Sequence, residues 1–334
     1  MSYNPNAPGK KGTVFGLPFK ETDAQIIIVP VPWDVTSSYH SGSSLGPEAI
    51  LEASTQLDLE LFGKNAPWKK GIYLCEIQES IKNRSKKLRK QAEPYFESLE
   101  LGLNTGSFAR VIEECNAGCE TLVQEVRQTT QNYLDQEKKV GLLGGDHGTA
   151  LGLMQALKSK YMNFGILHID AHMDLRKSYE GLIHSHASIM YNALKIESVS
   201  TLVQVGIRDF CEEEKEFAEK NPKIHTYFND DIQSKMFEGA LWRELCDSML
   251  ENLPKKVYIS FDIDGLEPSL CPGTGTPVPG GLSFDEAVYL LDCVRKSGRE
   301  VVGFDLCEVA PRIGDNDWNA NVGARILYQL ISHL

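Results

Sequence analysis

The chain has 334 residues, of which 42% are hydrophobic and 24% charged, and its formal net charge is −12. This composition is that of a globular protein, and the length suits one large α/β domain with additions. The acidic balance disfavours nucleic-acid binding, because phosphate backbones carry the same sign of charge. No run approaches the roughly 18 consecutive apolar residues of a membrane helix, and residues 1–20 lack a signal-peptide pattern. We therefore expect a cytoplasmic protein that does not span a membrane.

The polar start of the chain, rich in Pro and Gly, is interpreted as an N-terminal extension over residues 1–22. Residues 23–334 are then expected to form a single domain. A basic run follows between residues 80 and 90, made of Lys82, Arg84, Lys86, Lys87, Arg89 and Lys90. Such a run could bind an anion or a partner, but it is more typical of a solvated helix or loop face.

Short apolar runs recur along the chain, each followed by polar or Gly-rich residues and then by a helical stretch. Continuously apolar runs are typical of strands buried on both faces of a parallel sheet. We predict strands at residues 24–31, 139–143, 164–169, 201–205, 256–261 and 301–304. Apolar residues spaced three and four apart predict helices at residues 108–137, 150–160, 212–220, 236–252, 284–296 and 321–334. This alternation indicates a three-layer α/β/α domain with a central, mostly parallel sheet.

Eight cysteines are scattered along the chain without a CxxC pair. Cys115 and Cys119 are four residues apart on a predicted helix, a spacing that could suggest a metal pair. Because several of the cysteines lie inside apolar runs, buried reduced thiols are the better interpretation.

Charged side chains follow five of the predicted strands, at the point where each strand ends. They are Asp146 and His147, then Asp170, His172 and Asp174, then Arg208 and Asp209, then Asp262 and Asp264, and finally Asp305 and Glu308. In open α/β sheets, ligands bind just beyond the carboxyl ends of the strands. These side chains are therefore expected to meet at one rim of the sheet.

The run of Asp170, His172 and Asp174 is the sharpest of these signals. Alternate residues of an extended segment point the same way, so the three side chains can converge, and Asp262 and Asp264 repeat the spacing on another strand. Clustered carboxylates repel one another, and two divalent cations would offset their charge. Aspartate and histidine ligands without a thiolate favour Mn²⁺, with Ni²⁺, Co²⁺ or Fe²⁺ as less obvious alternatives. Alternatively, the same residues could be helix caps and turn residues of a loop that binds no metal.

The other histidines are weighed by their context. His147 alone would more often be a core histidine, but its Gly-Gly-Asp-His-Gly setting favours a metal ligand. His168 lies inside a predicted strand, and we interpret it as a packing or supporting residue, not as a ligand. His40, His225 and His333 receive an ordinary structural interpretation.

Six segments carry a family resemblance. They are PWDVTSSYHSGSSLGPEAI (32–50), GGDHGTALG (144–152), HIDAHMDLR (168–176), QVGIRD (204–209), SFDIDGLEPSLCPGTGTPVPGGL (260–282) and GFDLCEVAP (303–311). Together they resemble the ureohydrolase (arginase/agmatinase) family, most closely the agmatinases, from about residue 24 to the end. The resemblance implies an arginase-like fold and a homo-oligomer, a trimer or a hexamer.

The resemblance also implies a role for each ligand. One metal would be held by His147, Asp170, Asp174 and Asp262. The second metal would be held by His172, Asp170, Asp262 and Asp264, so that Asp170 and Asp262 bridge. A hydroxide between the metals would attack a guanidinium carbon, and Asp174 could orient it and pass its proton to the leaving amine.

Further residues match family positions that handle the substrate. Glu308 matches the carboxylate that pairs with the guanidinium, and His186 matches the proton-shuttle position. His184, two residues away, is an alternative relay and a candidate for substrate binding. Arg176 lies where relatives contact the far end of the substrate, and a cation there would suit a carboxylate better than an amine tail. Alternatively, Arg176 faces solvent or pairs with Glu180.

Two departures from the family pattern are present. Glu267 replaces the last aspartate of DxDxxD, and His186-Ala187-Ser188 replaces His-Gly-Thr. Neither removes an expected ligand, although each could reshape the loop or pocket that contains it.

The leading hypothesis is metal-dependent hydrolysis of a small guanidino compound to urea and an amine, with agmatine giving putrescine as the first candidate. Guanidinobutyrate or another guanidino acid, free guanidine and formimidoylglutamate are the alternative substrates. A deacetylase-type amidohydrolase with one metal would not need the full ligand set. A metal-binding subunit without catalysis is the remaining hypothesis.

Overall fold

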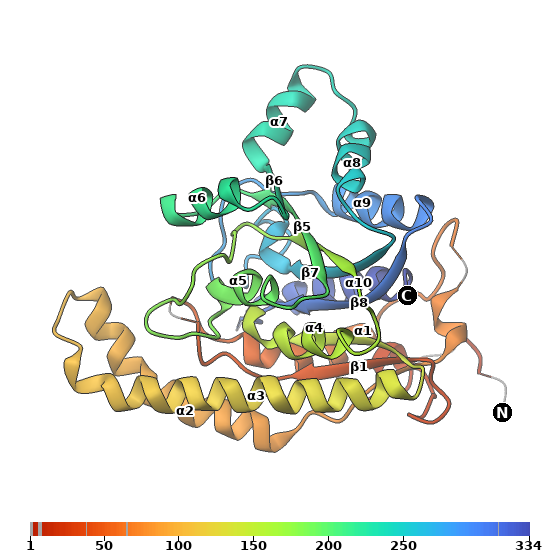
Figure 1. The fold of residues 1–334 in the computed structure, drawn as a ribbon. Coiled ribbons are helices and arrows are strands. Elements are labelled where there is room, and N and C mark those ends of the chain that lie inside the picture. Colours follow the sequence, from red (N-terminus) through yellow and green to blue (C-terminus); the bar gives the residue numbers. More distant parts are fainter. Residues whose placement is uncertain (1–2, 6–8, 38, 65, 313) are drawn as a thin grey trace.

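The computed structural model describes residues 3–5, 9–37, 39–64, 66–312 and 314–334. In this part of the chain, eight strands form one sheet in the order β2-β1-β3-β8-β7-β4-β5-β6, and every neighbouring pair is parallel (Figure 1). The strands are β1 (Ile26–Val31), β2 (Ile72–Leu74), β3 (Lys139–Gly144), β4 (Phe164–Ile169), β5 (Val199–Ile207), β6 (Ile224–Phe228), β7 (Lys256–Asp262) and β8 (Glu300–Cys307). The predicted sheet is confirmed, and it is wholly parallel.

Helices cover both faces of the sheet and enclose two apolar cores. One core receives side chains from α1 (Gly46–Ser54), α7 (Asn229–Phe237), α8 (Trp242–Glu251), α9 (Phe284–Lys296) and α10 (Trp318–Ile331). The other receives side chains from α2 (Glu79–Glu100), α3 (Ala109–Asp135), α4 (Leu151–Leu157), α5 (Ile189–Ala193) and α6 (Glu212–Lys220). The three-layer α/β/α prediction is therefore confirmed.

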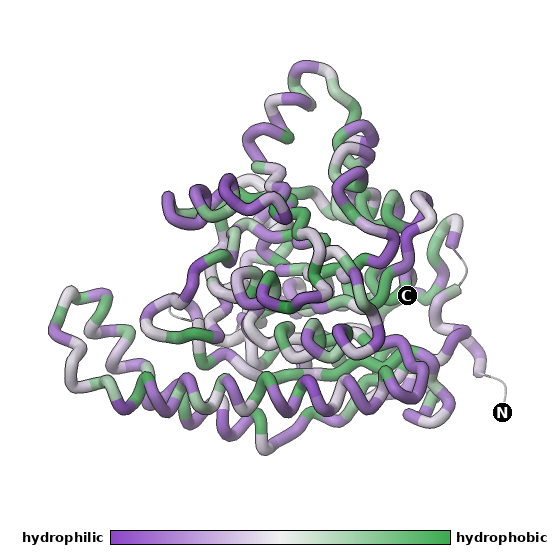
Figure 2. The backbone as a smooth tube through the Cα atoms, viewed as in Figure 1, coloured by the Kyte–Doolittle hydropathy of each residue, from purple (hydrophilic) through white to green (hydrophobic). Residues whose placement is uncertain are grey.

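Hydropathy follows these layers. In Figure 2 the apolar residues gather along the central strands, whereas the outer helix α6 is drawn largely as polar. The short 3-10 helices are η1 (Val14–Gly16), η2 (Ser43–Leu45), η3 (Pro67–Lys70), η4 (Gly106–Phe108), η5 (His147–Ala150), η6 (His186–Ser188) and η7 (Ile263–Gly265). Within the described residues, no helix is both long and apolar enough to cross a bilayer.

The predicted helix over residues 236–252 is confirmed for its larger part, since α8 spans Trp242–Glu251, but its predicted start is wrong. The chain instead forms α7 and α8, separated at Gly239, whose φ of 101° is incompatible with a continuous right-handed helix. The strand β6 was not predicted, because this edge strand is only partly buried and contains polar residues such as His225. Its alternation is therefore weaker than that of the central strands.

The structure also shows where the proposed N-terminal extension and the basic run lie. Within the proposed extension, of which residues 1–2 and 6–8 lie outside the described part, Phe15 is buried and packs on Tyr328 with ring centroids 4.8 Å apart. The basic run lies on α2, which forms a long helical pair with α3 (Figure 1). Arg84 of this run pairs with Glu125, and Arg89 donates to the carbonyl of Ser37.

All eight cysteines are free, and six of them are buried.

The strand order explains where polar residues can meet. The strands β3, β8, β7 and β4 are consecutive neighbours in the middle of the sheet, and all run in the same direction. Their carboxyl ends therefore lie side by side along one edge. Four of the segments with predicted ligands or substrate-binding groups begin at these four ends.

Candidate metal centre and substrate pocket

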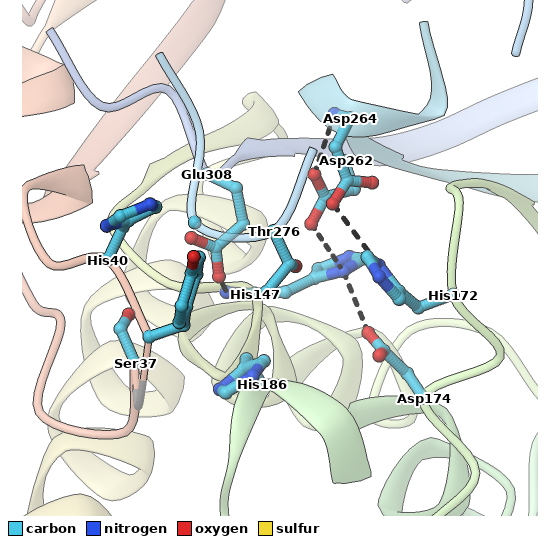
Figure 3. A pocket seen from close by; sticks show the side chains of 12 residues that line it. Ser37, His40, His147, His172, Asp174, His186, Asp262, Asp264, Thr276 and Glu308 are labelled. Atoms are coloured by element: carbon cyan, nitrogen blue, oxygen red, sulfur yellow. Dashed lines mark hydrogen bonds and ion pairs between the residues drawn. The ribbon is translucent and has the colours of Figure 1, made fainter. Parts of the chain in front are cut away.

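The six predicted metal ligands come together at this edge. His147 lies in η5 just after β3, while Asp170, His172 and Asp174 follow β4, and Asp262 and Asp264 lie at the end of β7 and in η7. Five of the six line one cavity, together with Ser37, Tyr39, His40, His186, Gly275, Thr276 and Glu308 (Figure 3). The sixth, Asp170, is fully buried beside it. The ligand assignments themselves stay predictions.

The imidazole of His147 is held so that one nitrogen faces the carboxylates. Its Nε2 lies 2.8 Å from the Ser260 hydroxyl, whose single proton is donated to Asp305 at 2.8 Å. The Ser260 oxygen must then accept a hydrogen bond from Nε2–H, so Nδ1 carries a lone pair whenever the ring is neutral. Burial lowers the pKa of His147, but the surrounding aspartates outweigh burial and raise it well above its usual value, so without a metal ion Nδ1 would hold a proton. Nδ1 is buried and has no hydrogen-bond partner among the described residues, yet three carboxylate oxygens lie within 3.3 Å of it. A lone pair surrounded by anions fits a site for a cation.

Asp170 stands between the two imidazoles. Its Oδ2 is 3.1 Å from Nδ1 of His147, and its Oδ1 is 3.4 Å from Nδ1 of His172. Two sets of close ligand atoms share this residue, one with His147, His168 and Asp174 and one with His172 and Asp264. The carboxylate can therefore contribute to two cation positions, as a bridging ligand does.

The electrostatics of the site also call for positive charge. Burial raises the pKa of Asp262 well above its usual value, and Asp264 and Asp170 add to the shift. Burial raises the pKa of Asp174 to about 6, and Asp170 contributes to this as well. In the absence of a cation, these carboxylates would hold protons more readily than exposed ones. A divalent ion would stabilise their charged forms, so the donor set fits the metal centre that the sequence predicts.

Backbone geometry supports the same cluster. Asp174 has a φ of 54° and Glu308 a φ of 65°, which are unusual for residues other than Gly or Asn. At Gly145, a Cβ atom would lie 1.9 Å from the Trp33 carbonyl oxygen, so only glycine permits this approach of η5 to the neighbouring loop. Such strain is held by the surrounding contacts and often occurs at functional sites.

Glu308 and His186 line the cavity beside the metal ligands (Figure 3). Oε1 of Glu308 accepts the backbone N–H of His147 at 2.8 Å. Burial raises the pKa of Glu308 well above its usual value, with a further contribution from Asp146. A buried carboxylate of this kind favours a cationic partner such as a guanidinium. Burial, with smaller contributions from His172 and His147, lowers the pKa of His186 to about 4, so its ring is neutral at physiological pH.

A second cavity adjoins the first on the outside. The two share Tyr39, His172, Asp174, His186 and Thr276, and the outer one is also lined by Arg176, Tyr179, Ala187, Asp209, Phe210 and Glu214. Nε of Arg176 is 3.7 Å from Glu214, and its guanidinium lies 4.8 Å from the centre of the Tyr179 ring. Arg176 thus pairs with Glu214, a residue that the sequence analysis did not consider.

His184 makes a different contact from His186. Its Nε2 lies 2.8 Å from a carboxylate oxygen of Glu120 on α3. Glu267 is exposed and accepts a hydrogen bond from the Ser269 hydroxyl. The replacement of the family's aspartate by Glu267 therefore lies outside the cluster of predicted ligands. The predicted roles of His184 and Arg176 in substrate binding remain predictions.

The sequence analysis did not predict the supporting roles of several residues. Ser260 sits within a strand run and carries no motif signal of its own, although a hydroxyl amid apolar neighbours is a weak hint. Arg208 donates to the carbonyl oxygens of Gly206, Asp264, Leu266 and Val278 and so fastens the loop that contains Asp264. His40, interpreted as ordinary, lines the inner cavity next to Tyr39. The contacts of Ser260 with His147 and of Arg208 with Asp264 join segments that are far apart in the sequence.

Comparisons with known proteins agree with this geometry. The family model described as "Arginase family" matches residues 24–332. An N(1)-aminopropylagmatine ureohydrolase of Thermus thermophilus is 34% identical over 311 residues, which cover 89% of this chain and 87% of the relative. An agmatinase of Neisseria meningitidis is 30% identical and covers 93% of this chain and 87% of the relative.

Solved structures share the fold. The agmatine ureohydrolase of Thermoplasma volcanium matches with a TM-score of 0.71 at 22% identity, over 95% of this chain and 92% of that chain. Because the family model spans most of the sequence and the relatives match over nearly their full length, this chain belongs to the arginase family and is a hydrolase of carbon–nitrogen bonds in guanidino compounds.

Proposed function

We propose that this protein hydrolyses a guanidino compound with a cationic amine tail, with agmatine, giving urea and putrescine, as the first candidate. The proposal depends above all on Glu308, a buried carboxylate that faces the same cavity as the predicted metal ligands. A cationic group would stabilise the charged form of this carboxylate, and a planar guanidinium can do so with two parallel hydrogen bonds.

The proposed reaction adds water to the central guanidinium carbon and breaks its bond to the alkylated nitrogen. When bound, two divalent cations, Mn²⁺ in our proposal, would supply an activated water at neutral pH. Glu308 holds the guanidinium in place, which removes much of the entropic cost of bringing the reactants together. The leaving amine needs one proton to depart, which the added water releases, and the neutral His186 at the cavity wall can accept such a proton and pass it on.

The outer cavity supports an amine tail over an acid tail. Among the described residues that line this cavity, Arg176 is the only lysine or arginine. Its guanidinium already contacts Glu214 and the Tyr179 ring. Asp209 adds a second carboxylate, with a side chain that is 67% exposed. The lining is therefore negative on balance, which reverses the argument that Arg176 suggests when the sequence is considered alone.

A longer substrate, N(1)-aminopropylagmatine, is the second candidate. A relative with that named activity is 34% identical to this chain, compared with 30% for the agmatinase of Neisseria meningitidis. Aromatic rings from Tyr39, Tyr179 and Phe210 line the same outer cavity as the two carboxylates. Rings and carboxylates together suit a chain with a second ammonium group.

Substrate choice is tested by the initial rates of urea release from Mn²⁺-loaded protein. The panel contains agmatine, N(1)-aminopropylagmatine, arginine, guanidinobutyrate and guanidine, with formamide release from formimidoylglutamate measured in parallel. We expect kcat/KM for an amine-tailed substrate to exceed that for guanidinobutyrate by about tenfold or more, which corresponds to about 1.4 kcal/mol of tail recognition. Turnover of an acid with none of either amine would contradict the proposal.

The tail contacts are tested by changing Asp209 and Arg176 separately. We expect Asp209→Asn to raise KM for N(1)-aminopropylagmatine up to about fivefold, since exposed ion pairs contribute about 1 kcal/mol or less. Arg176→Ala should leave KM for the amines unchanged or lower it. Glu213→Gln on α6 is the matched control, because it removes an exposed charge outside the described cavity lining. A rise in KM for amines with Arg176→Ala would show that this cation assists them.

A further inference from the structure

Behind the predicted ligand Asp170 lies a hydrogen-bonded chain that the proposed reaction does not use. Oδ2 of Asp170 is 2.7 Å from Nε2 of His168, and Nδ1 of His168 is 3.0 Å from Nε2 of Gln204. The Gln204 side chain also contacts the carbonyl oxygen of Met173 at 2.8 Å and the hydroxyl of Thr226 at 3.1 Å. His168, Gln204 and Asp170 are all fully buried.

The partners fix every proton in this chain. A carbonyl oxygen can only accept, so the group of Gln204 that faces Met173 must be its NH₂. The second hydrogen of that NH₂ then points to Nδ1 of His168, which must accept it. The proton of the neutral His168 ring is thereby placed on Nε2, where it is donated to Asp170. Thr226 completes the arrangement by donating its hydroxyl proton to Oε1 of Gln204.

This placement of protons orients Asp170. Oδ2 receives the proton of His168, and Oδ1 receives the backbone N–H of His172 at 2.6 Å. Each oxygen keeps a second lone pair, and the two oxygens face His147 and His172 respectively. The carboxylate cannot rotate without losing both hydrogen bonds. It is therefore fixed in the orientation that a ligand shared by two cations needs.

Gln204 supports the loop of Asp174 at the same time. The Met173 carbonyl that it binds directly precedes Asp174, whose positive φ places its carboxylate near His147. One amide thus joins β5, β4, the ligand loop and, through Thr226, the edge strand β6.

We propose that Gln204 is a positioning residue of the metal centre, which fixes the tautomer of His168 and the ligand loop, and that Thr226 supports it from β6. The inference rests on the proposed metal-dependent function, because it concerns how well the protein holds the cations. Partners that orient metal ligands in this way affect metal affinity even though they do not touch the metal.

The test measures metal binding and not activity alone. In Gln204→Glu the ionised carboxylate can only accept hydrogen bonds, so it favours a His168 ring that donates from Nδ1–H, and it repels the Met173 carbonyl. We expect the dissociation constant for Mn²⁺, measured by calorimetry on metal-free protein, to rise about 10- to 100-fold. In ¹⁵N spectra of metal-free, histidine-labelled protein, the His168 ring should change from the Nε2–H tautomer to a form protonated at Nδ1.

Two more conservative variants test the inference even if Gln204→Glu does not fold. Thr226→Val removes only the hydrogen bond to Oε1 of Gln204, and we expect it to weaken Mn²⁺ binding by a few-fold. Thr201→Val is the matched control, because its hydroxyl on β5 donates to the Lys223 carbonyl and takes no part in the chain. If Gln204→Glu does not fold, equal Mn²⁺ affinities in these two variants overturn the inference.

The outcomes separate the two proposals. Folded Gln204→Glu that binds two Mn²⁺ ions within twofold of the parent affinity, with an unchanged tautomer, overturns the role of Gln204 and leaves the proposed function intact. Parent protein that binds no Mn²⁺ overturns the metal centre and the inference with it. Parent protein that binds two ions but releases no urea overturns the proposed function only.

Discussion

Replacing Asp262 with Asn should leave the metal-free protein as stable as the parent and abolish its stabilisation by Mn²⁺. Burial and two neighbouring aspartates raise the pKa of Asp262, so its charge opposes folding when no cation is bound. The amide has the same shape, and its oxygen can still accept the Asp264 N–H, a contact of 2.9 Å in the parent. The charge that a cation requires is nevertheless lost.

Asp262→Asn should strongly reduce both the stabilisation by Mn²⁺ and the rate of urea release. Thermal unfolding should show that the parent gains about 2.7 kcal/mol when free Mn²⁺ is about 100-fold above its dissociation constant, and that Asp262→Asn gains little. Urea release should fall by about 10³-fold or more, since several kcal/mol of transition-state stabilisation depend on the cations. Glu267→Gln is the matched control, because Glu267 lies in the segment that follows Asp262 and is exposed. Equal Mn²⁺ stabilisation in Asp262→Asn and the parent would refute the ligand assignment.

Replacing Glu308 with Gln should leave the metal content intact and nearly eliminate turnover. The amide oxygen of Gln can still accept the backbone N–H of His147, a contact of 2.8 Å in the parent, so the cavity should keep its shape. A buried guanidinium would lose its charged partner, and such losses cost about 2–5 kcal/mol. We therefore expect kcat/KM for the best amine-tailed substrate to fall between about 30-fold and several thousand-fold.

Two measurements distinguish this result from damage to the site. Elemental analysis should find the same number of Mn²⁺ ions in Glu308→Gln as in the parent, and the Mn²⁺-induced shift in unfolding temperature should be equal. The loss should also be similar for agmatine and N(1)-aminopropylagmatine, because both present the same guanidinium to this residue. A variant with full metal content and parental kcat/KM would show that the guanidinium binds elsewhere.

The sequence alone was sufficient to predict which side chains meet at the rim of the sheet, whereas their role as metal ligands stays a prediction. Continuous apolar runs indicated buried parallel strands, and parallel strands place their carboxyl ends on one edge. The alternation of Asp170, His172 and Asp174 needs only local extended geometry to bring the side chains to one side. For this reason all six predicted ligands meet at one site, although they come from three separate segments.

Boundaries and supporting contacts depended on information that local patterns do not carry. The helix predicted over residues 236–252 was placed too early, because the apolar spacing continues through Gly239, whereas the helix α8 begins only at Trp242. The pairing of Arg176 with Glu214 requires the start of α6 to lie against the ligand loop. No rule of residue spacing predicts that contact. The contact changes the charge expected for the outer cavity, where the tail of the substrate is proposed to bind.

The sequence by itself determined the fold class, the rim at which polar residues gather and the type of chemistry their side chains favour. The tertiary structure decided which residues hold the predicted ligands in place, namely Ser260 behind His147 and Gln204 with His168 behind Asp170. The physical reason is that a ligand's residue type and strand position are local properties. The hydrogen bonds that fix a tautomer or orient a carboxylate join side chains from different strands, and they exist only once the sheet has formed.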